Sequence, residues 1–102
     1  MSATTSYPEM RRNITHQMGT LAQSVPEVMK SFNALHRSGT APGAIDTKTK
    51  ELIALAIAVA VRCDGCIAFH VEDALAADAS REEIMDTLGV AILMGGGPAV
   101  VY

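Results

Sequence analysis

The sequence has few aromatic residues and no strand-like alternation. Only 4% of its 102 residues are aromatic and none is Trp, whereas 49% are hydrophobic. Ala, Val, Ile, Leu and Met therefore carry the apolar content. No segment alternates apolar and polar residues with the period of two that is typical of half-buried strands. This composition is typical of packed helices, and we expect an all-α fold.

Long apolar runs and clusters of basic residues are missing as well. The longest uncharged apolar run covers the ten residues 52–61, whereas a membrane span needs about 20. The net charge is −3, and Lys and Arg are not concentrated as in proteins that bind phosphate backbones or anionic lipids. The first 13 residues lack the apolar stretch of a signal peptide. We expect a cytoplasmic protein with no nucleic acid partner and no membrane partner.

The length indicates a single domain over residues 1–102, because domains typically contain about 100 to 150 residues. A chain this short buries only about 60 to 70% of the surface that its unfolded form exposes. With so many hydrophobic residues, part of the apolar surface is expected to lie in a subunit interface. The sequence therefore predicts a homo-oligomer.

Apolar spacing, Pro and Gly positions and capping residues predict about five helices. The third is apolar on every side after its first turn, so we expect it to be central and to form an antiparallel hairpin with the fourth. Gly and Pro in residues 38–44 predict the main loop. The expected helices are 8–22, Pro26 to Gly39, 47–60, the cysteines through residue 78, and Ser80, in a capping box with Glu83, to the glycines at 95–98.

Both cysteines and one of the three histidines lie within residues 63–70. On a helix, Cys63, Cys66 and His70 fall within about 60° of one another. The two sulfurs can reach disulfide distance at a helix start, where N–H groups also stabilise a thiolate. The helix end favours Cys63 as the more acidic thiol, whereas His70, as a base one turn away, favours Cys66. The choice between the two stays open from the residues alone.

Glu51 is the candidate that orients His70. Residues 51 and 70 are equally distant from a turn at 60–61, so they should lie at matching depth on neighbouring antiparallel helices. The predicted site is therefore the chain Glu51, His70 and Cys66, with Cys63 as the second sulfur. His16 and His36 have no acidic or thiol companion at helical spacing, and we expect both on the surface without a role.

Other interpretations of these residues exist. The two cysteines could be small buried hydrophobic residues. They could also bind zinc with His70 and, as a fourth ligand, Glu51 or a water. Reducing conditions in the cytoplasm and the C-x-x-C spacing favour redox chemistry, with no cofactor and no metal, over a structural role.

The chain resembles the alkylhydroperoxidase D (AhpD)-like proteins of the carboxymuconolactone decarboxylase superfamily. The resemblance covers residues 48–84 and 89–100. Its motif is a glutamate, eleven residues, C-x-x-C and a histidine after three more, matched here by Glu51, Cys63, Cys66 and His70. One departure is Gly65, which stands where peroxidase-type members carry a further histidine.

The resemblance implies a helical thiol peroxidase that assembles as a homotrimer or homohexamer. In that scheme Cys66 attacks a hydroperoxide, Cys63 resolves the sulfenic acid as a disulfide, and Glu51 and His70 relay the proton. A dithiol reductant restores the thiols. Cofactor-free decarboxylation of a lactone acid, the other activity of the superfamily, remains as an alternative.

Overall fold

Every regular element in the described part of the chain is a helix, as the sequence predicted. The protein is described here by a computed structural model that covers residues 6–102. Over this part of the chain it forms six helices: α1 (Tyr7–Ser24), α2 (Pro26–Thr40), α3 (Thr47–Ala60), α4 (Asp64–Ala76), α5 (Arg81–Gly95) and α6 (Gly97–Val101). Within residues 6–102, no helix combines the length and the apolar character that crossing a membrane requires.

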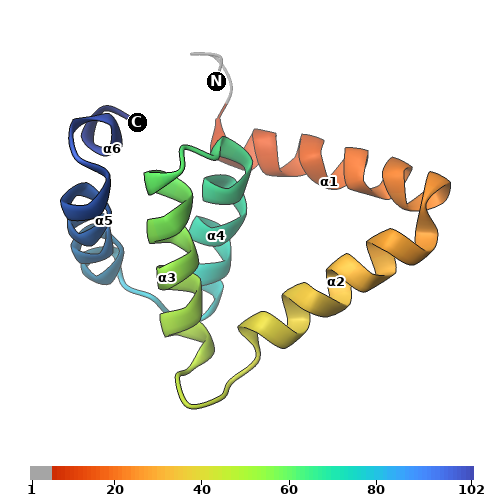
Figure 1. Cartoon of the computed structure of the whole chain (residues 1–102), viewed down its shortest axis with the longest axis horizontal. Coiled ribbons are helices and arrows are strands. Elements are labelled where there is room, and N and C mark those ends of the chain that lie inside the picture. Colours follow the sequence, from red (N-terminus) through yellow and green to blue (C-terminus); the bar gives the residue numbers. More distant parts are fainter. Residues whose placement is uncertain (1–5) are drawn as a thin grey trace.

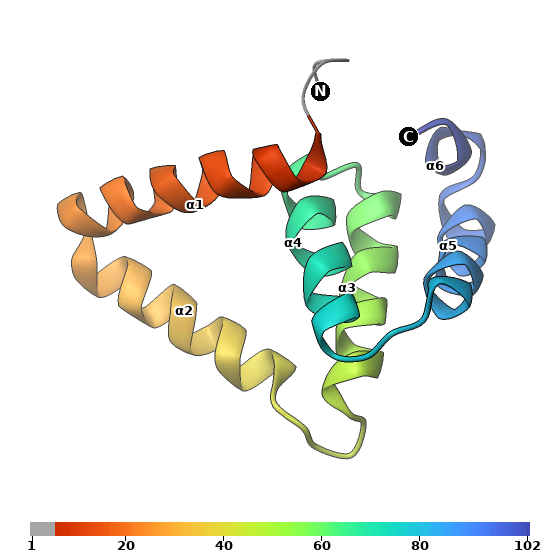
Figure 2. The same cartoon turned by 180° about the vertical axis from the view of Figure 1, so that it is seen from behind.

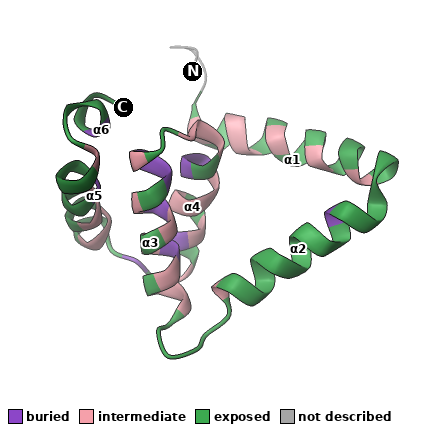
Figure 3. Ribbon diagram, viewed as in Figure 1, coloured by how far each residue is buried: buried purple, intermediate pink, exposed green. Residues whose placement is uncertain are grey.

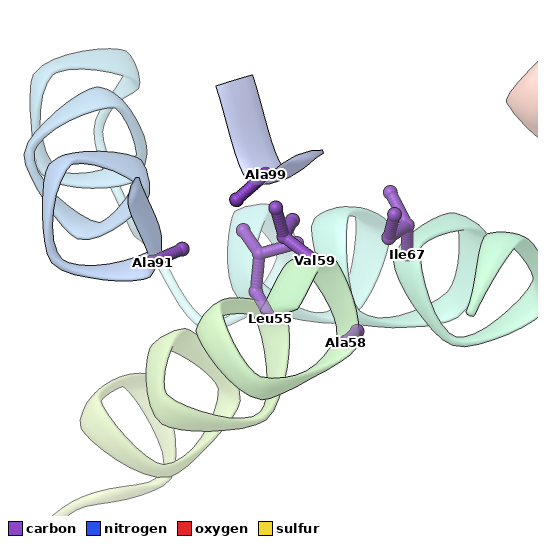
Figure 4. Packing of buried hydrophobic residues seen from close by; sticks show 6 residues of the cluster. All are labelled: Leu55, Ala58, Val59, Ile67, Ala91 and Ala99. Carbon is purple, nitrogen blue, oxygen red and sulfur yellow. The ribbon is translucent and has the colours of Figure 1, made fainter. Parts of the chain in front are cut away.

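The antiparallel pair α3 and α4 forms the centre of the molecule (Figures 1 and 2). Helix α5 packs on the other side of α3, and α1 packs on α4. The core between α3, α4, α5 and α6 is built largely from small and branched side chains, which let the helices approach closely. Figure 4 shows its buried members, which are Leu55, Ala58, Val59, Ile67, Ala91 and Ala99.

Helices α1 and α2 form a V that projects away from the central pair (Figure 1). One side chain, Arg11, ties α1 to α4: its guanidinium donates to the Phe69 carbonyl (3.0 Å) and to Oδ1 of Asp73 (3.2 Å). It also lies 4.5 Å from the centre of the Phe69 ring. Helix α2 is almost entirely exposed, with Met29 as its buried residue (Figure 3). The V therefore has little support from the rest of the chain.

Most helix ends lie within about two residues of the sequence expectation, and two differences have a clear physical cause. Helix α2 continues through Gly39 to Thr40, and Pro42 explains its end better than the glycine does, because proline disfavours helical backbone in the residue before it. At the C-terminal end, Gly96 adopts a positive φ of 68° and ends α5. The chain then re-forms a short helix, α6, with Pro98 in its first turn. The sequence prediction treated residues 95–98 only as a stop and missed α6.

Candidate active site

The turn between α3 and α4 places the first cysteine. Helix α3 ends in a Schellman motif, in which the Arg62 N–H donates to the Val59 carbonyl (3.2 Å) and the Cys63 N–H donates to the Ala58 carbonyl (3.0 Å). This motif needs a left-handed residue, and Arg62 supplies it with a φ of 59°. Cys63 then caps the N-terminus of α4. The residues that end α3 therefore lead directly into Cys63, the N-cap residue of α4.

Cys63 and Cys66 are joined as a disulfide, with Cα atoms 5.3 Å apart. The Cys66 N–H also donates to Sγ of Cys63 (3.3 Å). Cys66 is exposed and Cys63 is half-buried. The expectation that both sulfurs reach bonding distance at a helix start is confirmed. Because the cap position of a helix favours negative charge, reduction would leave a sulfur there in a setting that stabilises a thiolate.

Glu51 and His70 form the polar contact that the hairpin geometry predicted. Oε2 of Glu51 lies 2.7 Å from Nδ1 of His70. The Glu51 side chain is 3% exposed and that of His70 is 19% exposed. A carboxylate partner requires the proton on Nδ1, which leaves Nε2 as the basic nitrogen. His70 follows Cys66 by one turn of α4, so an oriented base and an exposed sulfur share one helix.

Two residues beside this pair were missed by the sequence analysis. His36 was expected on the surface without a companion, but its ring stacks on that of His70, with centroids 6.2 Å apart and planes 22° apart. Asp73 has no role in the sequence-based prediction, but in the structure it is half-buried beside Arg11. The spacing of Asp73 three residues after His70 was a usable signal. Nothing in the sequence near His36 indicated its contact, because α2 reaches α3 only through the loop at 41–46.

The departure at Gly65 has a packing reason. A Cβ atom built on Gly65 would lie 2.9 Å from Cδ1 of Ile14 on α1. The position that the resemblance gives to an additional histidine therefore faces α1 at close range. Because residue 65 is Gly, the predicted relay consists of Glu51 and His70 alone.

The C-terminal residue contacts the start of α4. The Tyr102 hydroxyl donates to Oδ1 of Asp64, and this hydrogen bond raises the pKa of Tyr102 to about 12. Burial and the charge of Asp64 also raise the pKa of Tyr7. Both phenols therefore stay protonated at neutral pH and can act as hydrogen-bond donors. The two tyrosines line an open pocket of about 380 Å³ together with Arg62, Asp64, Pro98 and Val101. Arg62 and Asp64 are the sequence neighbours of Cys63.

The chain belongs to the carboxymuconolactone decarboxylase family, whose model matches residues 26–102. This match confirms the family recognised from the motif of Glu51, Cys63, Cys66 and His70. It also includes α2, which the motif did not cover.

Solved structures support this assignment. A carboxymuconolactone decarboxylase family protein from Legionella pneumophila is 45% identical and has a TM-score of 0.90, with 94% of this chain and 86% of that chain covered. A protein from Thermotoga maritima is 38% identical with a TM-score of 0.66, over 71% of this chain and 65% of that chain.

Curated relatives share the sequence over most of its length. An uncharacterized protein of Cupriavidus necator is 38% identical over 99 residues, which are 97% of this chain and 88% of the relative. An uncharacterized protein in the cox locus of Paracoccus denitrificans is 35% identical over 85 residues, which are 83% of this chain and 77% of the relative.

Proposed function

We propose that the protein is a thiol-dependent peroxidase that reduces hydroperoxides through Cys66 and Cys63. The observation that carries this proposal is an exposed sulfur, bonded to a second sulfur, one helical turn before an imidazole held by a buried carboxylate. Redox-active dithiols with a nearby base are typical of thiol oxidoreductases. Cytoplasmic localisation belongs to the same proposal, because a reducing compartment regenerates the thiols.

The reaction begins with the reduced pair. The Cys66 thiolate attacks the distal peroxide oxygen, the O–O bond breaks, and the alcohol leaves as Cys66 becomes a sulfenic acid. The Cys63 thiolate then attacks the Cys66 sulfur, which forms the disulfide and breaks the S–O bond. The hydroxide that leaves takes up the proton that the Cys63 thiol lost and becomes water. The peroxide gains two electrons and the two thiols lose them. A dithiol reductant returns both sulfurs to thiols by exchange.

Glu51 and His70 move the proton in this scheme. Nε2 of His70 takes the proton of the Cys66 thiol and can return it to the alkoxide that leaves. Glu51 keeps His70 in the required tautomer through Nδ1 (2.7 Å) and stabilises the imidazolium that forms. Exposure and proximity to His70 favour Cys66 as the attacking residue, whereas its cap position suits Cys63 as the resolving thiolate.

The test uses the reduced chain, freed of reductant, and tert-butyl hydroperoxide. We expect one peroxide to consume two thiols and leave a crosslink between Cys63 and Cys66 by mass spectrometry. Cys66→Ser should abolish peroxide consumption. Cys63→Ser should still react once and leave a sulfenic acid on Cys66 that dimedone traps. A Cys66→Ser variant that consumes peroxide at the normal rate would refute the assignment.

Cofactor-free decarboxylation is the second candidate, and the family match is the observation in its favour. This chemistry needs no sulfur pair. Decarboxylation of a lactone acid that persists when Cys63 and Cys66 are both replaced by serine would support it. Peroxide consumption that depends on both cysteines would count against it.

We also propose that the chain acts as a homo-oligomer, a trimer or hexamer. The support is apolar surface that the single chain leaves exposed. It includes Val28, Phe32 and Leu35 along one side of α2, and Ile53 and Ile57 on α3 with Val61 at its C-cap. Side chains of this kind are normally covered in the functional form of a protein.

A further inference from the structure

A second set of potential ligands lies beside the disulfide and includes neither cysteine. His36, Glu51, His70 and Asp73 each offer one ligand atom, and within the described residues these atoms all lie within 4.8 Å of one another. They come from three helices: His36 from α2, Glu51 from α3, and the other two from α4. The four residues are brought together by the packing of three helices, so their proximity is not a consequence of sequence spacing along one helix.

The ligand types suit a first-row divalent cation. Two imidazole nitrogens and two carboxylate oxygens make a four-ligand set of the kind that zinc accepts in tetrahedral geometry. Around such an ion the ligand atoms would be about 3.3 Å apart, since each bond is about 2.0 to 2.1 Å long. The ligand atoms that are farthest apart would have to approach one another from up to 4.8 Å, whereas Glu51 Oε2 and His70 Nδ1, now 2.7 Å apart, would have to separate slightly to admit the ion. His36 is the exposed member of the set.

The surroundings leave an ion room to enter, and a neighbouring side chain holds one of the ligands, Asp73, in place. His36, Glu51 and Asp73 line an open groove of about 570 Å³. Arg11 donates to Oδ1 of Asp73 at 3.2 Å and restrains this carboxylate, as hydrogen-bond partners of metal ligands commonly do. The ammonium of Lys48, which also lines the groove, is held by Glu83 at 2.8 Å.

We propose that His36, Glu51, His70 and Asp73 form a binding site for a divalent cation of the zinc type. The ion would replace the proton that Glu51 and His70 share, because both residues would become ligands. Metal binding and the proton relay of the proposed function would then exclude each other. Metal binding itself does not depend on the proposed function. Inhibition of the peroxidase by the bound ion does depend on it.

The experiment measures Zn²⁺ binding to the oxidised full-length chain by isothermal titration calorimetry. With the disulfide intact, neither sulfur can act as a thiolate ligand. We expect one saturable site per chain. His36→Asn should weaken binding by a factor of at least about ten, the lower end of the loss seen even for outer-shell partners of metal ligands. The matched control is His16→Asn, since His16 is an exposed histidine on α1, and it should bind as the parent does.

Three results would overturn the proposal. They are no saturable Zn²⁺ binding by the oxidised chain, binding confined to the reduced chain, and equal affinity in the parent and His36→Asn. None of these would affect the peroxide test, which follows thiol loss without added metal. Conversely, if the chain binds Zn²⁺ but does not consume peroxide, the metal site stands and the proposed peroxidase function, with its proton relay, fails.

Discussion

Glu51 is the charged residue that the described fold buries, at 3% exposure. A buried carboxylate is costly unless it is paired, and its partner here is Nδ1 of His70. Because an apolar side chain at this position would pack with less penalty, the pair points to chemistry more than to stability.

Replacing Glu51 with Gln tests this residue directly. The amide keeps the shape but removes the charge that orients His70 and stabilises its protonated form. We expect peroxide-driven thiol loss to slow by about 10²-fold, the usual scale for a lost acid-base group. Stopped-flow measurement of thiol loss provides the rate. The control is Glu27→Gln, which changes an exposed acid in the first turn of α2 and should leave the rate of thiol loss unchanged. Equal rates in the parent, Glu51→Gln and Glu27→Gln would show that Glu51 has no part in the relay.

The sequence predicted the contact of Glu51 with His70 because both residues belong to one hairpin with a short turn. Counting residues from a turn expected at 60–61 indicated the pair, although the link lies at residues 61–63, so that Glu51 is ten residues before it and His70 is seven after it. The position of His36 could not be predicted in this way, since the loop at 41–46 can direct α2 along many paths. Asp73 was missed for a different reason: its contact with Arg11 depends on how α1 crosses α4.

At the scale of elements, both ends of α4 are reached through left-handed residues that are not glycine. Arg62 precedes α4 with a φ of 59°, and Asp78 follows it with a φ of 69°. The Asp78 N–H donates to the Leu75 carbonyl and the Ala79 N–H to the Ala74 carbonyl, which is again a Schellman motif. These hydrogen bonds hold a strained conformation at each end of the helix.

Asp78→Gly should therefore stabilise the protein. Glycine adopts positive φ without a steric penalty, so we expect the free energy of unfolding to rise by about 0.5–1 kcal/mol after its larger chain entropy is counted. Urea denaturation measures the change. Asp86→Gly, on the exposed side of α5, should lower stability by a few tenths of a kcal/mol. A loss in both variants would mean that Asp78 is not strained.

Helix starts should make the protein sensitive to acid. The hydrogen bond from Thr49 lowers the pKa of Asp46, the cap of α3, and the contact with Lys48 lowers the pKa of Glu83 at the start of α5. A lowered pKa in the fold means that each group contributes stability above its unfolded pKa. That contribution is lost as pH falls through the folded pKa.

We accordingly expect the thermal unfolding midpoint to drop as pH is lowered below about 4, where such carboxylates take up protons. Asp46→Asn should show a smaller drop than the parent, since one of the titrating groups is gone. Asp86→Asn is the control and should follow the parent. If the unfolding midpoint of Asp46→Asn falls as far between pH 6 and pH 3 as that of the parent, the Asp46 cap does not cause the acid sensitivity.

The six-helix order was predictable only in part because glycine serves different purposes along the chain. Gly39 lies inside α2, where its missing side chain has no visible consequence for the helix. Gly96 does end a helix, since it takes the positive φ that favours glycine. The glycines and the proline at residues 95–98 are compatible both with the end of α5 followed by a loop and with the start of another short helix.

At the scale of the whole molecule, the single chain is flat and open. It measures 39 × 38 × 21 Å with a radius of gyration of 14.4 Å, whereas a compact domain of this length would have about 13 Å. Its accessible surface is 6769 Å², compared with about 5,500 Å² for a typical monomer of this mass. The V of α1 and α2 explains the excess (Figure 3). These dimensions favour the proposed assembly.

Phe32→Glu tests the assembly. Phe32 is 50% exposed in the isolated subunit, and a carboxylate buried at a subunit interface would be strongly unfavourable. Sedimentation velocity should show the parent as a multiple of 10.7 kDa and the variant shifted toward the single chain. Asn33→Glu, at the neighbouring exposed position on α2, should keep the parent's size. A monomeric parent would refute the assembly.

The short link between α3 and α4 also restricts where the chain can change in length. Only Val61, Arg62 and Cys63 separate the two helices, and all three take part in closing one helix or capping the next. An insertion there would shift His70 along its helix axis, away from Glu51. Insertions between residues 41 and 46 would leave that alignment intact, so we expect natural variation in length to accumulate in the second link and spare the first.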